Sequence, residues 1–326
     1  MKRIKIAALC FIALIGAALP ARAQQKQKLP YPVKVCGGAE SSIDAPMRIA
    51  GFTDYAPFLW IKYDPTAKKN QEYSYHGFIA KPLMSTMKDM GVVYIRAMNF
   101  KDYDDTLLAA KNGKLDIIMS TYFQGKEEAF VDYVYPSYFG NHMVVVSRAD
   151  KKVVVNDLSE LSGKIGVLRE EEGVEPLIRG LLPSDTKVHV VRGAEAAFKM
   201  LMSGEADFMI TSPYAAVAEA RRFKIWKDVY IGEKSMRLVQ LFISFSKRSR
   251  CRYFKKTFAH EFMKYFKDPA EREKMMQAAI DEWVEMHKDE PPLQYGKPET
   301  TTPETSQPSA VPAETAATAP AQPAVQ

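Results

Sequence analysis

Apolar residues follow two patterns along the chain: short continuous runs, and longer stretches with apolar positions three or four residues apart. The runs predict buried parallel strands, and the spaced stretches predict helices. Expected strands occupy 48–52, 92–97, 117–120, 143–147, 165–168, 188–191, 208–211 and 241–246. Expected helices occupy 79–90, 103–111, 175–182, 194–202 and 213–222. Strands that alternate with helices predict an α/β fold with parallel sheets.

A last helical pattern carries phenylalanines at four-residue spacing, at positions 254, 258, 262 and 266. Residues four apart lie on the same face of a helix. We expect this stripe to pack into the core.

Two stretches, 107–120 and 198–211, repeat the same order of signals. In each, a helical pattern ends at a glycine, an aspartate follows three positions later, and a short apolar strand ends in a hydroxyl residue. The marker residues are Gly113, Asp116 and Ser120 in the first copy and Gly204, Asp207 and Thr211 in the second. The repeat indicates two similar α/β lobes. Ligands bind beyond the carboxyl ends of such strands, so 120–122 and 211–214 are expected to face a site.

The N-terminus has the pattern of a secretory signal peptide. Basic residues at 2–5 precede an apolar run at 6–19 and the sequence Ala21-Arg22-Ala23. These features predict cleavage after Ala23 and export to the periplasm. A membrane-spanning helix is disfavoured because the run is short and ends at Pro20.

Composition divides the rest of the chain into three parts. Residues 24–46 are expected to form a leader with little regular structure. Residues 47–287 are expected to form the folded body. Residues 288–326 are rich in Pro, Thr and Ala and lack the apolar residues needed to offset their ordering entropy, so we expect a disordered tail.

Charge gives no case for nucleic-acid binding. The chain has 45 basic and 39 acidic residues, and four of the basic residues lie in the predicted signal peptide, so the mature chain is nearly neutral. A local basic stretch at 247–256 is either a solvated face or a contact for a partner or a lipid surface.

Cysteine and histidine usage indicates no cofactor, metal site or catalytic set. The mature chain keeps Cys36 and Cys251, which either form a disulfide or remain separate thiols. The five histidines are scattered and show no metal-ligand spacing.

Short motifs follow one another through the folded body. They are Tyr55-Ala-Pro-Phe58, Gly77-Phe78, GKLDII at 113–118, Val131-Asp-Tyr133 with Pro136 and Tyr138, three valines at 144–146, LSELSGKIGV at 158–167, GEAD at 204–207, and Phe245-Ser-Lys247. Each is weak alone. In this order and at this spacing, they resemble the bacterial extracellular solute-binding proteins of family 3, the periplasmic amino-acid-binding type.

The resemblance implies a two-lobed, type II periplasmic-binding-protein fold that closes around a ligand by hinge motion. Lobe 1 is expected at 47–143 and 243–287, and lobe 2 at 144–242, with hinges near 143–146 and 241–245. It also implies a monomer that binds a small-molecule solute and delivers it to an inner-membrane ABC permease.

Three contacts that hold an amino acid in this family are missing. An arginine that pairs with the ligand carboxylate aligns with Glu127, or with Glu128 after a one-residue shift. A Gly-Thr turn after the first lobe-2 strand aligns with Glu170 and Glu171, and an aspartate that binds the ammonium group aligns with Ser212.

These departures change the expected ligand. A carboxylate ligand beside Glu127 would bring like charges together in a partly desolvated cleft. If Glu127, Glu170 and Glu171 face the cleft, they suit a cation such as an amine. Alternatively, 170–172 only start a helix, where acidic residues favour the positive end of the dipole.

Aromatic residues near the expected cleft are better preserved. Tyr55 aligns with a ring that stacks on the ligand, and stacking with cation–π attraction suits a flat or cationic solute. Phe58 and Trp60 lie near Tyr55 in the sequence and either line the site or form core. The residues expected to line the cleft are Asp54, Tyr55, Phe58, Ser120, Thr121, Tyr122, Glu127, Glu170, Glu171, Thr211, Ser212 and Tyr214.

Two other functions remain open. Some proteins similar to this family are periplasmic dehydratases, and His76 with Asp54 could form an acid–base pair, although an anionic substrate fits poorly beside Glu127. The other alternative is a sensor or scaffold with a degenerate cleft, which the loss of all three anchors would produce.

Overall fold

The computed structural model describes residues 36–37, 45–68 and 71–296. The predicted signal peptide, most of the predicted leader and residues 297–326 lie outside this part. Among the described helices, none combines the length and the apolar character needed to cross a membrane.

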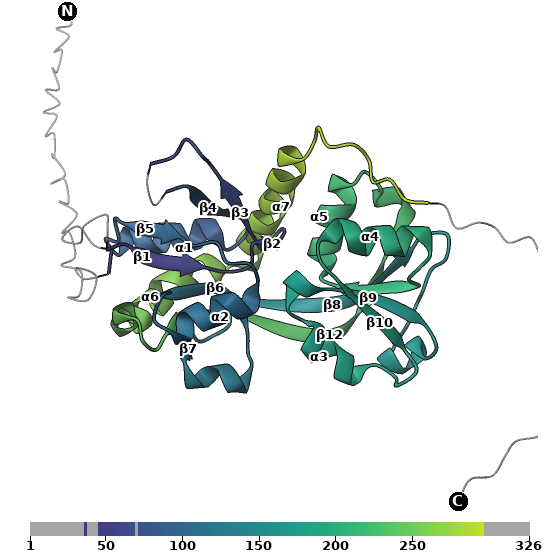
Figure 1. Cartoon of the computed structure of the whole chain (residues 1–326), viewed down its shortest axis with the longest axis horizontal. Helices are drawn as coiled ribbons and strands as arrows, with labels where there is room; N and C mark the ends of the chain where they lie inside the picture. Colours follow the sequence, from purple (N-terminus) through teal and green to yellow (C-terminus); the bar gives the residue numbers. More distant parts are fainter. Residues whose placement is uncertain (1–35, 38–44, 69–70, 297–326) are drawn as a thin grey trace, which may run out of the picture.

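The described chain forms two α/β lobes side by side (Figure 1). Lobe 1 contains the strands β1 (Met47–Ala50), β5 (Ile95–Ala97), β6 (Ile117–Tyr122) and β7 (Val131–Tyr133), and lobe 2 contains β9 (Ile165–Arg169), β10 (Lys187–Val191) and β11 (Phe208–Thr211). Within each lobe the central strands pair in parallel, as β5–β1–β6 and as β10–β9–β11. The predicted α/β class and two-lobed fold are therefore confirmed.

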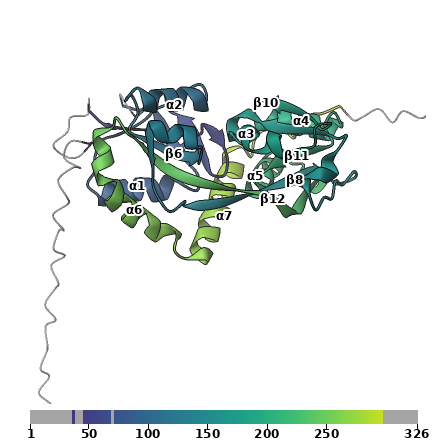
Figure 2. The same ribbon diagram turned by 90° about the horizontal axis from the view of Figure 1, so that it is seen from below.

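Two long strands, β8 (Phe139–Arg148) and β12 (Val229–Ser246), join the lobes. They pair with each other in antiparallel fashion from Val229↔Arg148 to Leu241↔Phe139. Figure 2 shows them running together between the lobes. Beyond this crossing, β12 pairs with β6 and β7 of lobe 1, and β8 pairs with β11 of lobe 2. One continuous sheet thus passes through both lobes.

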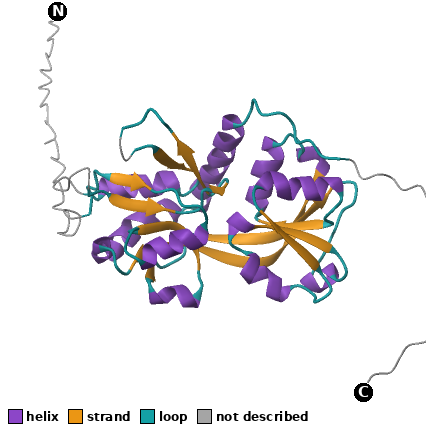
Figure 3. Cartoon of the chain, in the orientation of Figure 1, coloured by secondary structure: helices purple, strands orange, loops and turns teal. Residues whose placement is uncertain are grey.

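Helices cover the faces of this sheet (Figure 3). Lobe 1 has α1 (Ala80–Asp89), α2 (Tyr103–Lys111) and α6 (Lys255–Phe262), and lobe 2 has α3 (Glu175–Ile178), α4 (Ala194–Ser203) and α5 (Pro213–Arg222). The predicted bounds of α2 and α5 are confirmed. Helix α3 is shorter than predicted because the chain continues as a 3-10 turn from Arg179 to Leu181.

Five strands and helices were missed from the sequence, and one of them is the short strand β7. A small sheet of β2 (Asp54–Tyr55), β3 (Leu59–Tyr63) and β4 (Tyr73–His76) lies outside the main sheet. Helix α7 (Pro269–Met286) follows α6 as a separate element. It starts afresh because Asp268 caps it, accepting a hydrogen bond from the Ala270 amide, and Pro269 occupies its first turn. The four phenylalanines before it are buried, as predicted.

The repeated aspartates have the same structural role in the two lobes. The Asp116 carboxylate accepts the Arg48 amide at 2.8 Å, and the Asp116 amide donates to the Arg48 carbonyl at 2.9 Å. The Asp207 carboxylate accepts the Ile165 amide at 3.0 Å, and the Asp207 amide donates to the Ile165 carbonyl at 2.7 Å. Each aspartate therefore ties its own strand to the neighbouring parallel strand. The glycine before it has φ of +70° at Gly113 and +85° at Gly204.

Cys36 and Cys251 form a disulfide, with their Cα atoms 5.5 Å apart. Both residues are buried. The bond fastens the described start of the chain to the segment that precedes α6, both in lobe 1. Of the two alternatives left open by the sequence, the structure contains the disulfide.

A third connection joins the lobes after α7. Residues 287–296, here called the C-terminal strap, cross from α7 to lobe 2 (Figure 1). The Leu293 amide donates to the Phe223 carbonyl at 3.1 Å, and the Leu293 side chain is buried in the lobe-2 core with Phe223 and Ile225. The prediction that the disordered tail starts at 288 is therefore wrong for residues 288–296. The segment was predicted to be disordered because its composition is polar, but its single leucine is buried in the lobe-2 core.

Candidate functional site

The strand ends marked by the sequence repeat meet where the lobes face each other. Strand β6 ends at Tyr122, β11 at Thr211 and β9 at Arg169, and β2 of lobe 1 contacts the 3-10 turn Glu170–Glu172 of lobe 2. Two regions can be distinguished here. One is a packed polar cluster at the centre, and the other is a cavity at the edge.

The lobe-1 side of the centre is a hydrogen-bonded group of fully buried side chains. The Tyr55 hydroxyl receives hydrogen bonds from the Tyr122 hydroxyl at 3.2 Å and from Asn141 Nδ2 at 2.8 Å. Burial raises the pKa of both tyrosines, so both are neutral at physiological pH. Tyr55 is thus hydrogen-bonded within the protein and does not project into open space.

The lobe-2 side of the centre is occupied by Arg169, which is 2 % exposed. Its Nη2 atom donates to the Asp54 carbonyl at 3.0 Å and lies 3.4 Å from Asp54 Oδ2. Its Nη1 atom lies 3.6 Å from Glu172 Oε1. Burial alone would lower the pKa of Arg169, but the charges of Glu172 and Asp54 outweigh this effect and raise it. The guanidinium therefore remains charged and bridges the two lobes.

Two carboxyl groups near Arg169, those of Glu172 and Glu219, are themselves buried. Burial raises the pKa of Glu172 and of Glu219 to about 7, although the charge of Arg169 opposes the shift in both. Glu172 Oε1 accepts a hydrogen bond from Thr211 Oγ1 at 2.6 Å, and Glu219 Oε2 pairs with Arg222 at 3.3 Å. Several buried atoms of this cluster have no hydrogen-bond partner among the described residues: Arg169 Nε, Glu172 Oε2, Glu219 Oε1, Ser212 Oγ and Asn141 Oδ1.

The cavity at the edge has a volume of about 260 Å³ and is lined by both lobes. Its acidic lining residues are Asp102, Asp104 and Glu127 from lobe 1 and Glu170, Glu171 and Glu175 from lobe 2. Among the described residues that line it, Lys126 is basic. The charged residues that line this cavity are therefore mainly acidic.

Some of these carboxylates are already engaged. Glu170 pairs with Arg192 at 2.8 Å, and Glu175 pairs with Arg179. Asp102 accepts the Asp105 amide at 2.9 Å and so caps α2. These three groups have less capacity to bind a solute.

Glu127 and Glu171 are different, because each has one carboxylate oxygen without a partner among the described residues. Glu127 is 1 % exposed, and its Oε2 accepts a hydrogen bond from the Tyr133 hydroxyl at 2.9 Å. The Tyr103 hydroxyl lies beside Glu127 Oε1 but outside hydrogen-bond geometry. Burial raises the pKa of Glu127, and the Tyr133 hydrogen bond opposes the shift. Glu171 Oε1 accepts the Gly193 amide at 2.8 Å and lies 3.9 Å from Arg192 Nε.

The residues expected to line the cleft fall into several groups. Asp54, Tyr55, Tyr122, Thr211 and Ser212 belong to the central cluster, whereas Glu127, Glu170 and Glu171 line the cavity. Ser120 and Thr121 are packed inside lobe 1, where Thr121 Oγ1 donates to the Phe242 carbonyl at 3.2 Å and Ser120 bonds to Tyr138. Phe58 lies where the lobes meet: the centroid of its ring is 5.0 Å from that of Tyr55 in lobe 1 and 6.4 Å from that of Tyr214 in lobe 2. Tyr214 points to α7, where its hydroxyl donates to Glu273 at 3.2 Å.

Sequence reasoning missed Asn141, Arg169, Glu172 and Glu219. Arg169 could have been noticed, since it is a charged residue at the end of an apolar strand and next to the aligned anchor Glu170. Asn141 lies within β8 and Glu219 lies within α5. Nothing in the neighbouring sequence indicates that either side chain faces the site.

The proposed acid–base pair of His76 and Asp54 is not formed. The His76 ring bonds to Glu282 at 2.8 Å and to Ser74 at 3.0 Å, while the Asp54 carboxylate faces Arg169. Across the described part of the chain, no group of three or more His, Cys, Asp or Glu side chains is arranged to hold a metal ion.

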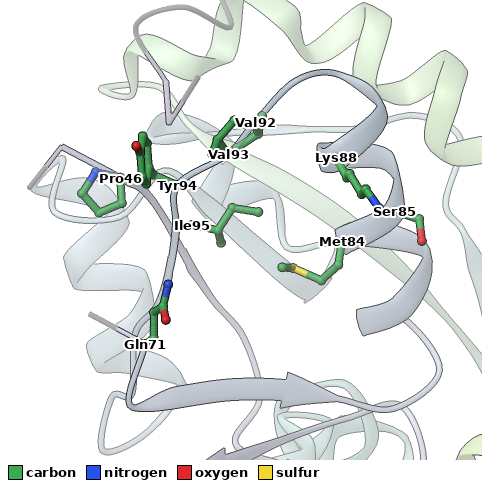
Figure 4. A pocket seen from close by; sticks show the side chains of 9 residues that line it. All are labelled: Pro46, Gln71, Met84, Ser85, Lys88, Val92, Val93, Tyr94 and Ile95. Atoms are coloured by element: carbon green, nitrogen blue, oxygen red, sulfur yellow. The ribbon is translucent and has the colours of Figure 1, made fainter. Parts of the chain in front are cut away.

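A larger cavity, of about 610 Å³, lies elsewhere on lobe 1. Figure 4 shows side chains of α1, including Met84 and Lys88, on one side of it and residues 92–95 on another. Its lining also includes Pro46 and Gln71, which adjoin segments outside the described residues. Its boundary is incomplete for this reason, and we assign it no ligand.

No protein-family model matches this sequence, and no curated protein matches it either. Solved structures do match. An amino acid ABC transporter substrate-binding protein of Streptococcus pneumoniae, bound to L-arginine, has a TM-score of 0.59 at 15% identity, over 73% of this chain and 95% of that one. The VFT2 periplasmic domain of Bordetella pertussis BvgS has a TM-score of 0.54 at 16% identity, over 73% and 92%.

A third match is an ancestral amino-acid-binding protein described as a precursor of cyclohexadienyl dehydratase. Its TM-score is 0.55 at 19% identity, over 72% of this chain and 94% of that one. At these identities the likeness concerns the fold. The chain therefore has the two-lobed, type II periplasmic-binding-protein fold that these proteins share.

Proposed function

We propose that this protein binds a small cationic solute in the acidic cavity between its lobes. The observation that carries the proposal is the pair of carboxylates from opposite lobes, Glu127 and Glu171, which are among the residues lining the same cavity and which each have one buried oxygen without a partner among the described residues. A buried carboxylate oxygen without a partner is costly. A bound ammonium group supplies the positive charge and the hydrogen-bond donors that such carboxylates accept.

The charge and size of the cavity narrow the class of solute. A ligand carboxylate would face several acidic groups in a partly desolvated space, so zwitterionic amino acids and small acids are disfavoured. A volume of about 260 Å³ suits a compact molecule such as a short amine. Because the two oxygens belong to different lobes, the same cation would also hold the lobes together.

Calorimetric titration of the mature protein with methylamine, putrescine, glutamate and acetate tests the proposal. We expect an amine to bind and the two anions not to bind. Glu127→Gln and Glu171→Gln should each weaken amine binding by about tenfold or more, since each removes a charge-assisted contact. Glu128→Gln is the matched control: its side chain is exposed on the same 3-10 turn as Glu127 and lies outside the cavity.

The wider role follows from the sequence pattern. We propose export through cleavage after Ala23, a periplasmic location, a monomeric state and delivery of the solute to an ABC permease. The proposed lobes are 47–143 with 243–287, and 144–242, hinged near 143–146 and 241–245. The fold shared with an ABC transporter substrate-binding protein supports this role.

A sensor or scaffold is the second candidate, and the packed centre favours it. The position between the strand ends is filled by Tyr55, Tyr122 and Arg169, all buried. The BvgS domain has the same fold. Absence of binding by every amine tested would favour this candidate. Turnover of a small anionic acid would instead favour a dehydratase-like enzyme.

A further inference from the structure

We infer that the centre of the interlobe region is a guanidinium-binding site, and that the chain fills it with its own Arg169. The side chain enters from the end of β9 in lobe 2. Groups from both lobes surround its planar head, as they would surround a bound guanidinium compound.

The contacts come from both sides of the interface. Lobe 1 supplies the Asp54 carbonyl at 3.0 Å and the Asp54 carboxylate at 3.4 Å. Lobe 2 supplies Glu172 at 3.6 Å. Asp54 accepts from Nη2, Glu172 lies beside Nη1, and Nε has no partner among the described residues, so these groups meet the charge of the guanidinium from both lobes and bond to one arm of its donor fork.

The surroundings of Arg169 contain three carboxyl groups, and one of them, Glu219, also pairs with Arg222 at 3.3 Å. Asp54, Glu172 and Glu219 all act on the same guanidinium, and Glu172 and Glu219 are buried with one unpartnered oxygen each. The ion pair of Arg169 with Glu172 is almost inaccessible to solvent and therefore has a large desolvation cost. The ion pair lies where β2 of lobe 1 contacts the turn 170–172 of lobe 2. Arg169 links the lobes at the point where a solute would otherwise link them.

This arrangement makes the closed state independent of a solute at the centre. A two-lobed binding protein closes when a ligand contacts both lobes and favours the closed conformation. Here Arg169 supplies that contact permanently. The inference is separate from the proposed binding at the edge, which depends on Glu127 and Glu171.

Chemical rescue tests the inference. Arg169→Ala should lower the melting temperature by about 10 °C, because it leaves Asp54 and Glu172 without their cation. Millimolar methylguanidinium should bind in the vacated space and restore at least half of that loss. Methylammonium has the same charge without the fork and should restore much less.

Matched variants separate this effect from general salt effects and from the edge cavity. Arg148→Ala removes an arginine that pairs with Asp150 elsewhere in lobe 2, and methylguanidinium should not stabilise it. Rescue should persist in Arg169→Ala combined with Glu127→Gln, and should disappear in Arg169→Ala combined with Glu172→Gln. Equal responses of the wild type, Arg148→Ala and Arg169→Ala to methylguanidinium would overturn the inference.

A measurement on the wild type covers the case in which Arg169→Ala does not fold. Small-angle scattering of dialysed, solute-free protein should match the closed arrangement of the lobes. It should not change when methylguanidinium is added. A solute-free wild type with open lobes would also overturn the inference.

Discussion

At the residue scale, the chemistry of this protein lies in charged side chains that the two lobes enclose. Arg169, Glu172 and Glu219 are nearly inaccessible to solvent. Their burial raises the free energy of the ionised carboxylates, and Arg169 compensates for only part of that cost. The stability of the closed protein should therefore respond to protonation near neutral pH.

We predict that the free energy of unfolding falls as pH rises from about 4.5 to about 7. The folded protein holds protons on Glu172 and Glu219 up to about pH 7, whereas the unfolded chain releases them near 4.5, so the folded state binds more protons across this window. Each pKa unit of difference corresponds to about 1.4 kcal/mol. Urea unfolding at pH 5 and pH 7.5 measures the change.

Glu172→Gln should reduce the slope of this dependence, because glutamine does not titrate and only Glu219 of the two residues then contributes. Glu205→Gln, an exposed substitution in lobe 2, should leave it unchanged. Surface acids such as Asp150, whose pKa its hydrogen bond with Arg148 lowers, exchange protons at pH values below this window. They therefore do not contribute to the difference in stability between pH 5 and pH 7.5. An identical slope for the wild type and Glu172→Gln would contradict the prediction.

At the element scale, α7 and the C-terminal strap hold the lobes together from outside the sheet. Helix α7 contacts lobe 2 through an ion pair of Asp281 with Arg221 at 2.9 Å, and contacts lobe 1 by packing of Trp283 against Trp60. The strap then places Leu293 in the lobe-2 core. Opening of the lobes must disturb at least one of these contacts.

We predict that Leu293→Ala lowers the free energy of unfolding by about 2–3 kcal/mol, because it empties a buried apolar position. Truncation after His287 should lower it further and favour open lobes in solution scattering. Leu181→Ala, at an exposed leucine of the same lobe, should cost much less. Truncation after Gly296 is the control, because it removes none of these contacts. If it lowered the free energy of unfolding as much as truncation after His287, the role of the strap would be contradicted.

At the scale of the whole molecule, the disulfide closes a long loop, since Cys36 and Cys251 lie 215 positions apart. A cross-link over such a distance reduces the entropy of the unfolded chain. It also fixes the described start of the chain against lobe 1.

We predict that Cys251→Ser lowers the free energy of unfolding by about 2–5 kcal/mol under oxidising conditions. Reduction of the wild type with dithiothreitol should cause a similar loss. The double variant Cys36→Ser with Cys251→Ser serves as the control, and dithiothreitol should not affect it. If the reductant destabilises the double variant as much as the wild type, the assignment of the effect to this bond is wrong.

Much of the fold was predictable because its signals are local. The glycine and aspartate of each repeat mark a helix end and a parallel strand, and the predicted bounds of α2, α5 and β11 were confirmed. The predicted strand 241–246 is only the lobe-1 end of β12, which begins at Val229. The part of β12 before Leu241 is mostly exposed or partly exposed and contains several polar residues. Its sequence therefore lacks the long apolar run that predicts a buried strand.

The site was less predictable than the fold. Tyr122 and Thr211 were expected near the site because strand ends face it, and Tyr55, Glu127 and Glu171 were expected there because the family resemblance aligns them with ligand contacts. Whether a side chain lines a cavity, fills it or packs beneath it depends on the approach of the other lobe. Ser120 and Thr121 follow the same strand signal as Tyr122 and yet face the lobe-1 interior.

The sequence alone determined the two α/β lobes, the repeated strand ends and the acidic residues that replace the usual anchors, because each depends on neighbours in the chain. Only the tertiary structure decided that Cys36 meets Cys251, that Leu293 enters lobe 2 and that Arg169 fills the centre. Each of these contacts joins residues far apart in the chain, and their partners are set by the packing of the lobes.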